Sequence, residues 1–308
     1  MRLPNIVTAM SDILAGIAIG ASNLANTFGR VSDRHISFGE LLITNNTLEP
    51  LKPISLLVLS TIGLYGGGVV LNDVFDAELD KVERPERPIP SGAVSSRAAT
   101  IFGILLLCVG VIAAALAAGS LFSYSALIAF TIAIAAILYD RWAKHNDFFG
   151  PLVMGFCRAC NLLLGISILA YSVPAFWHVA LVPLVYIAAI TMVSRGEVHG
   201  GRKGTLYFAM FLYAAVILAM VFVSLNNSTV QSTLPFLLIL ALMILVPLQA
   251  AIQNPSGPAI GKAVKGGVIG LIALNAAWAA AFGDIFFAIV IILLLPVSIG
   301  LSRMFAVT

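Results

Sequence analysis

Charged side chains are scarce in this sequence. Only 10% of its 308 residues are Asp, Glu, Lys or Arg, whereas roughly a quarter are charged in soluble domains. Hydrophobic residues make up 60% of the chain, and the mean hydropathy is +1.03. The composition therefore excludes an ordinary soluble protein, and we expect no nucleic-acid partner.

Cysteine is also scarce. The three cysteines, Cys108, Cys157 and Cys160, all fall in apolar segments. The pair in GFCRACN has the Cys-x-x-Cys spacing of redox and metal-binding motifs, but no second pair completes a tetrahedral metal site. We interpret both residues as small side chains on a membrane helix.

Long apolar runs, in contrast, recur along almost the whole chain. Many approach the length of about 20 residues that crosses a bilayer, and they are continuous rather than alternating, which indicates helices and not a β-barrel. We predict an all-α, polytopic transmembrane bundle of nine or ten helices that forms a single domain over residues 1–308. The number is open because only Gly283 and Asp284 separate the last two runs. The predicted spans are Ile6–Ala21, Ile54–Leu71, Ala98–Ala118, Leu121–Leu138, Phe149–Tyr171, Val179–Val193, Leu206–Leu225, Leu234–Ala251, Val264–Phe282 and Ile285–Leu301.

The connections between the predicted spans differ in charge. After a first connection of mixed charge, the charged ones are Asn72–Arg97, Tyr139–Asp147, Ser194–Gly204 and Gln253–Lys262. The connections between them are short or uncharged. Because an excess of Lys and Arg marks the cytoplasmic side of a membrane, we expect the charged connections and the N-terminus on that side.

The segment LNDVFDAELDKVERPERPIPSG contains the strongest concentration of charge. Asn72, Asp73, Asp76 and Asp80 follow the pattern N-D-x-x-D-x-x-x-D, which places the three aspartates on one helical face. Carboxylates so placed repel one another unless a cation lies among them, and Mg²⁺ prefers such oxygen ligands together with substrate phosphates. The alternative is a solvated acidic helix end.

We interpret the three glutamates of this segment as such a solvated surface; they are Glu78, Glu83 and Glu86. The cations Lys81, Arg84 and Arg87 follow or alternate with them, in a stretch that its prolines keep out of the helix. Carboxylates that hold a metal, followed by guanidinium groups that bind oxyanions, indicate a diphosphate site.

NDVFDAELD followed by RPERPIPSG resembles the first aspartate-rich motif of the UbiA superfamily of intramembrane prenyltransferases. RLPNIVTAMSDILAG is similar to that family's first helix. The resemblance implies about nine transmembrane helices around a central cavity that opens to lipid. It also implies prenyl transfer from a diphosphate to an acceptor, usually aromatic, with Mg²⁺ as cofactor.

By the same resemblance, the first motif gains specific roles. Asn72, Asp73, Asp76 and Asp80 become metal ligands, with the three aspartates also counted as catalytic, and Arg84 and Arg87 become diphosphate contacts.

The family's second aspartate motif is incomplete in this chain. At its place the sequence reads SRGEVHGGRKG, which leaves Glu197 as the remaining metal ligand. His199 could substitute as a ligand or contact substrate, or it could be a hydrated loop histidine; imidazole suits softer metals better than Mg²⁺.

The loop YDRWAK departs from the family's Y-x-x-x-K by one residue. Tyr139 could stabilise an allylic cation through its ring, and Lys144 could hold the diphosphate. A membrane-interface anchor around Trp142 is the alternative. Asp140 receives no role.

Polar residues within the predicted spans suggest a pocket, because a charge in the membrane usually faces a cavity or a partner. Arg158 and Asn161 share a helical face, and we expect both to contact substrate; a structural pair of Arg158 with Asp12 is the alternative. Asn5 is expected to line the pocket near its rim. Asn275 is interpreted as a hydrogen bond between helices.

These observations predict a Mg²⁺-dependent prenyltransferase in a membrane, most simply the bacterial cytoplasmic (inner) membrane. Its expected partners are an isoprenoid diphosphate, a ring-containing acceptor and membrane lipid. A non-catalytic lipid-binding or transport protein of the same fold is the alternative, motivated by the incomplete second motif. A cation transporter would require carboxylates at mid-membrane, whereas these lie at a helix end.

Overall fold

The computed structural model describes residues 3–27, 51–196 and 200–304, and these ranges contain helices and turns but no strand. The α-helices are α1 (Leu3–Thr27), α3 (Leu51–Phe75), α4 (Ala77–Glu83), α5 (Ser96–Ala118), α6 (Tyr124–Arg141), α7 (Phe149–Ile166), α8 (Ser172–Phe176), α9 (Leu181–Ser194), α10 (Lys203–Asn226), α11 (Val230–Gln253), α12 (Gly257–Ala281), α13 (Ile285–Ile292) and α14 (Leu294–Met304). Two short 3₁₀ helices, η1 (Ala143–His145) and η2 (Trp177–Ala180), precede α7 and α9.

Ten helical segments in the described ranges are long and apolar enough to cross a membrane. The predicted all-α transmembrane bundle is therefore confirmed. The tenth segment, Ile285–Met304, consists of α13 and α14. Gly283, in the left-handed region with φ 84°, ends α12, and the Asp284 side chain accepts a hydrogen bond from the backbone N–H of Phe287 and so caps α13. Glycine after a helix and aspartate before one are the residues that such ends favour.

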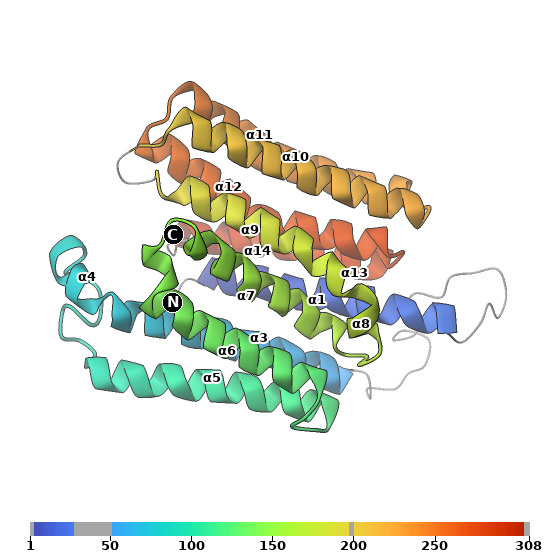
Figure 1. The fold of residues 1–308 in the computed structure, drawn as a ribbon, viewed down its shortest axis with the longest axis horizontal. Coiled ribbons are helices and arrows are strands. Elements are labelled where there is room, and N and C mark those ends of the chain that lie inside the picture. Colours follow the sequence, from blue (N-terminus) through green and yellow to red (C-terminus); the bar gives the residue numbers. More distant parts are fainter. Residues whose placement is uncertain (1–2, 28–50, 197–199, 305–308) are drawn as a thin grey trace.

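The long helices run side by side along one direction (Figure 1), with α10 and α11 at one flank and α5 at the other. The centre is formed by α1 and α12, which pack against each other. The central helices are more buried than the outer ones: 83% of the most apolar stretch of α12 is buried, but only 28% of that of α10. The outer helices thus present apolar side chains to the surroundings, as a lipid-facing surface requires.

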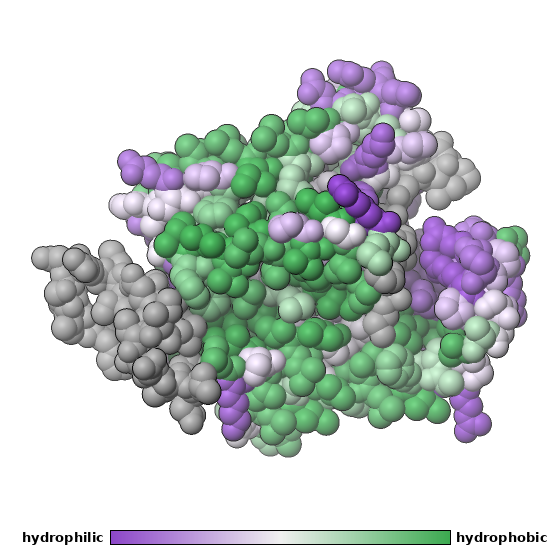
Figure 2. Space-filling view, turned by 180° about the vertical axis from the view of Figure 1, so that it is seen from behind, coloured by the Kyte–Doolittle hydropathy of each residue, from purple (hydrophilic) through white to green (hydrophobic). Residues whose placement is uncertain are grey.

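The two ends of the bundle differ from its middle. On the face seen in Figure 2, a broad hydrophobic band separates hydrophilic side chains at opposite ends. The most hydrophilic group in that view lies at the end that carries α4. The protein is a multi-pass integral membrane protein, and the charged segment between α3 and α5 lies at one rim of its apolar band.

Close contact between α1 and α7 depends on glycine. A Cβ atom on Gly16 would collide with the carbonyl oxygen of Leu162, and one on Gly165 with that of Ile13. Small residues allow membrane helices to approach this closely. The contact holds the polar residues of α1 against those of α7, where the site is found.

Candidate active site

A cavity of about 330 Å³ opens between α3, α6 and α7, with Ala9 of α1 in its wall. Along α3 the lining extends from Thr61 to Asn72, and it continues to Asp76 just after the helix, a rise of about 22 Å in all. The described residues that line it are Ala9, Thr61, Leu64, Tyr65, Gly68, Val69, Asn72, Asp76, Ile132, Ala136, Tyr139, Asp140, Lys144, Met154, Cys157, Arg158 and Asn161. Its middle is apolar, and polar side chains gather at its two ends.

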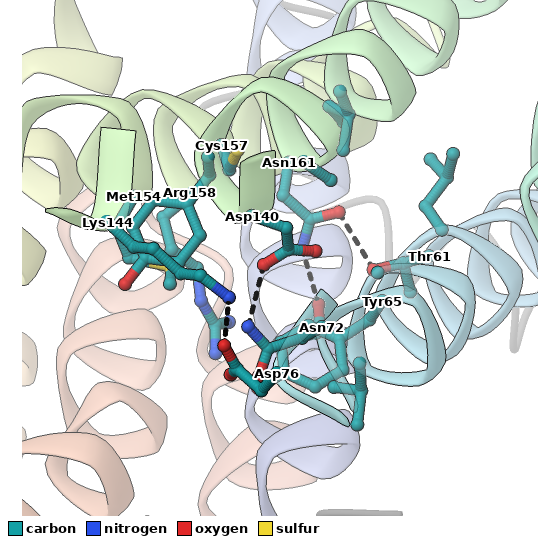
Figure 3. Close-up of a pocket in the computed structure, with 17 residues that line it drawn as sticks. Thr61, Tyr65, Asn72, Asp76, Asp140, Lys144, Met154, Cys157, Arg158 and Asn161 are labelled. Carbon is teal, nitrogen blue, oxygen red and sulfur yellow. Dashed lines mark hydrogen bonds and ion pairs between the residues drawn. The ribbon is translucent and has the colours of Figure 1, made fainter. Parts of the chain in front are cut away.

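The outer end of the cavity carries charged and amide groups (Figure 3). Lys144 Nζ lies 2.5 Å from Asp76 Oδ1, and Asn72 Nδ2 donates a hydrogen bond of 2.8 Å to Asp140 Oδ1. Both pairs join the end of α3 to the end of α6 and the 3₁₀ turn after it. We call these four residues the rim cluster. Tyr139 lies beside it, half-buried in the cavity wall.

The local chain path explains how Asp76 reaches this place. It occupies the single turn residue between α3 and α4, with φ −88° and ψ −1°, and backbone hydrogen bonds continue through it from Asn72 to Asp80. The side chain is 22% exposed. A carboxylate at this position can therefore face the cavity and remain accessible from the polar rim.

Asp73 and Asp80 have a different surrounding. Arg87 NH1 lies 2.6 Å from Asp80 Oδ2 and 3.5 Å from Asp73 Oδ1. As the prolines predicted, the segment that carries Arg87 is not helical; it folds back through turns onto α4. The structure thus divides the first motif: Asn72 and Asp76 line the cavity, while Asp73 and Asp80 face Arg87.

The inner part of the cavity is also polar. The guanidinium of Arg158 lies 5.7 Å from the ring centroid of Tyr65, and Thr61 Oγ1 donates a hydrogen bond of 2.8 Å to Asn161 Oδ1. Arg158 and Asn161 are 7% and 6% exposed. Both lie on the cavity wall, as the sequence predicted for a pocket.

Behind this wall, Asp12 joins three helices. Its Oδ2 accepts hydrogen bonds from Arg158 NH1 at 2.6 Å and Asn161 Nδ2 at 2.9 Å, and its Oδ1 accepts one from Asn275 Nδ2 at 2.7 Å. Arg158 NH2 also donates to Thr8. The predicted role of Asn275 between helices is confirmed, and Arg158 both pairs with Asp12 and lines the cavity.

The donor set at the rim fits a hard divalent cation. Asn72 and Asp76 offer an amide and a carboxylate oxygen, and Mg²⁺ is typically held by one or two carboxylates, waters and substrate phosphates. Within the described ranges no group of three or more His, Cys, Asp or Glu side chains could hold a metal ion.

The remaining predicted residues fall outside the cavity or outside the described ranges. Asn5 is buried on α1 and Arg84 is exposed, and neither belongs to the described lining. Glu197 and His199 lie outside the described residues, so their roles stay predictions. In the Cys-x-x-Cys pair, Cys157 lines the cavity and Cys160 is buried, both as free thiols.

Sequence reasoning missed some cavity residues. Asp140 received no role, although its pattern neighbours Tyr139 and Lys144 did, and it is buried in the rim cluster. Tyr65 and Thr61 gave no signal because an apolar helix carries many such residues. Tyr65 precedes Asn72 by about two helical turns and Thr61 by about three, so all three residues lie on one face of the helix, and this spacing could have identified them.

Fold and site together define the class: a polytopic helical membrane protein with a cavity that has apolar walls and a charged rim. The particular family follows from comparison with known proteins. The chain belongs to the UbiA prenyltransferase family, whose model matches residues 35–260.

Individual relatives point the same way. Digeranylgeranylglyceryl phosphate synthase of Metallosphaera sedula is 37% identical over 153 residues, which are 50% of this chain and 51% of the relative. The synthase of the same name from Methanoregula boonei is 36% identical over 155 residues, half of each chain. The chain therefore spans about half the length of the curated relatives it matches.

A solved structure agrees over a longer range. The structure of a digeranylgeranylglyceryl phosphate synthase superposes with a TM-score of 0.62 and covers 92% of this chain and 98% of its own. The sequence identity is 19%, so this similarity shows the fold alone.

Proposed function

We propose that this protein transfers a prenyl group from an isoprenoid diphosphate to an acceptor within the membrane. The observation that carries the proposal is the cavity itself, whose apolar walls end in the rim cluster. A prenyl chain is as apolar as lipid and can lie against such walls, while its diphosphate stays at the polar rim. Family membership makes this the reaction to test first.

The rim residues would act on the diphosphate. We assign the metal site to Asn72 and Asp76, with Asp73, Asp80 and Glu197 as further predicted ligands. Bound Mg²⁺ would neutralise the charge that develops on the departing diphosphate. Lys144, which is 12% exposed in its side chain and paired with Asp76, would contribute a second positive charge at the same place, and Arg84 and Arg87 stay predicted diphosphate contacts.

The walls would protect the reacting carbon. When the bond between C1 and the diphosphate oxygen breaks, C1 becomes part of an allylic cation that water would quench. Apolar lining residues exclude water, and the ring of Tyr139 beside the rim could stabilise the cation. The acceptor oxygen would then bond to C1 while its proton passes to the released diphosphate, and the protonated diphosphate would leave the site.

For the acceptor, the relatives favour one chemistry. Their name specifies a glyceryl phosphate product with two geranylgeranyl groups. We propose a hydroxyl of a glyceryl phosphate as the acceptor and geranylgeranyl diphosphate as the donor. The ring-containing acceptor that the family resemblance implied has no support in these names. Arg158 and Asn161 would hold the polar part of the acceptor at the inner wall.

The experiment is a turnover assay on the purified full chain in lipid nanodiscs. Radiolabelled geranylgeranyl diphosphate, Mg²⁺ and geranylgeranylglyceryl phosphate are supplied, and labelled product and free diphosphate are measured. We expect both, and we expect EDTA to abolish them. Tight binding of the donor without any diphosphate release would instead support the non-catalytic alternative.

A further inference from the structure

Asp140 is a buried carboxylate at the rim, and the proposed reaction assigns it no role. It is 4% exposed and lies at the end of α6, in the cavity wall. Burial of a carboxylate is costly unless hydrogen bonds compensate for the lost hydration. Because Asp140 lies beside the predicted metal ligands, we looked for a function of this buried carboxylate in the site.

In the contact between Asp140 and Asn72, the Asn72 amide is the donor and the carboxylate is the acceptor. An ionised carboxylate contains acceptors and no donor, whereas the asparagine amide has a donor end and an acceptor end. The 2.8 Å contact is made by Asn72 Nδ2, as an ionised partner requires. The amide oxygen of Asn72 is turned away from Asp140 as a consequence, and it is this oxygen that a hard cation would use.

Asp140 uses one carboxylate oxygen, Oδ1, to accept the hydrogen bond from Asn72. The described residues contain no group of three acidic, histidine or cysteine side chains that could hold a metal, although Asp76 and Asp140 both line the cavity. Asp140 contacts the predicted metal site through its hydrogen bond with Asn72 (Figure 3). A residue that orients a metal ligand in this way typically changes metal affinity by about 10–100-fold when it is replaced.

We infer that Asp140 is a positioning residue that fixes the Asn72 amide with its oxygen available to a divalent cation at the rim. The inference rests on the proposed function, since it assumes a cation and a diphosphate at this place. It explains why the last turn of α6 carries a carboxylate next to Tyr139. It also predicts that the pair can be exchanged: an amide at 140 and a carboxylate at 72 make the same hydrogen bond.

The test measures Mn²⁺ affinity and not turnover. Full-length protein in nanodiscs is titrated with Mn²⁺ in the presence of geranylgeranyl thiolodiphosphate, an unreactive donor analogue, and free Mn²⁺ is followed by electron paramagnetic resonance. Asp140→Leu keeps the side-chain size and removes both acceptors, so we expect affinity to fall about tenfold or more. The swapped variant Asn72→Asp with Asp140→Asn is expected to recover to within about threefold of wild type, since the hydrogen bond that orients residue 72 is restored.

Asp147→Leu is the matched control. Asp147 lies in the short connection between η1 and α7, its side chain is fully exposed and pairs with Arg195, and neither residue lines the cavity. It should bind Mn²⁺ like wild type. Because the swapped variant must fold in order to recover, its recovery separates positioning from simple loss of structure.

The outcomes are distinct. If wild type binds no Mn²⁺ with the analogue, the proposed function fails and this inference fails with it. If wild type binds but Asp140→Leu is unchanged, the positioning role is wrong and the proposed function stands. If Asp140→Leu is weak and the swapped variant stays equally weak, Asp140 acts by itself and not through Asn72, which also overturns the inference.

Discussion

At the scale of single residues, the aspartates of the first motif have different contacts although they are close in sequence. Asp76 faces the cavity and Lys144, whereas Asp80, four residues later, is 4% exposed and bound to Arg87. The arginine that follows the motif therefore stabilises its far end in this structure. Asp76 is consequently the carboxylate whose loss should matter most for the reaction.

We expect Asp76→Asn to lower diphosphate release about a hundredfold or more, because it removes the charge that would hold Mg²⁺ and leaves Lys144 without its partner. The measurement is single-turnover release of labelled diphosphate at saturating donor. Glu78→Gln is the control, since Glu78 is exposed and pairs only with Lys81 among the described residues. Full turnover by Asp76→Asn would contradict the assignment.

The same scale shows where sequence reasoning stops. Asn72, Asp76, Tyr139, Lys144, Arg158 and Asn161 were predicted site residues, and all line the cavity. The sequence could not separate Asp73 from Asp76, because a turn of one residue at Asp76 decides which side chain faces inward. Nor could it identify Asp140, since a single carboxylate in the last turn of a helix has no periodic pattern that indicates its burial.

At the scale of elements, α1 is held by two kinds of contact. Glycines allow its backbone to touch α7, and Asp12 connects it to α7 and α12 through hydrogen bonds. In lipid, helices gain little from hydrophobic burial against each other, so close packing and polar contacts decide their association. Each contact can be tested separately.

For the packing contact, Gly165→Ala is expected to destabilise the protein by about 1–3 kcal/mol, because the added Cβ must displace the α1 backbone at Ile13. The free energy of unfolding can be measured by steric trapping in bicelles. Gly300→Ala is the matched control, since a Cβ there meets nothing within 4 Å. Equal stability of the two variants would show that the helices can separate at no cost.

For the polar contact, Asp12→Leu leaves the buried guanidinium of Arg158 without its carboxylate, and we expect a loss of about 3–5 kcal/mol in the same measurement. The double variant Asp12→Leu with Arg158→Leu removes both charges. It should be more stable than the single variant, since replacement of a buried pair by apolar residues is often nearly neutral. A double variant that is less stable than the single one would refute this account.

At the scale of the whole molecule, composition alone predicted most of the fold. Runs of apolar residues gave the spans, and the structure confirms the tenth by showing how Gly283 and Asp284 end one helix and begin the next. The order in which helices pack could not be predicted this way, because all the runs are similarly apolar. The family resemblance implied only a bundle of about nine helices around a central cavity, and the packing of α1 against α12 comes from the structure.

The orientation of the bundle in the membrane remains a prediction that labelling can test. The α4 end carries the Arg-rich segment around Glu86, and the opposite end of α5 leads to Phe122, which is 90% exposed. An α5 of 23 residues separates the two ends by about 35 Å. A basic excess marks the cytoplasmic side, so Glu86→Cys should react with a membrane-impermeant maleimide only in inside-out vesicles, and Phe122→Cys only in right-side-out vesicles.

Wild-type protein provides the background in both vesicle types, because its three cysteines lie within the apolar spans. The cavity rim lies at the same end as Glu86, so the labelling result also decides from which side a diphosphate enters. Labelling of both variants from the reverse sides would invert the bundle and place the rim cluster outside the cytoplasm. Labelling of both variants from one side would contradict the path of α5 through the membrane.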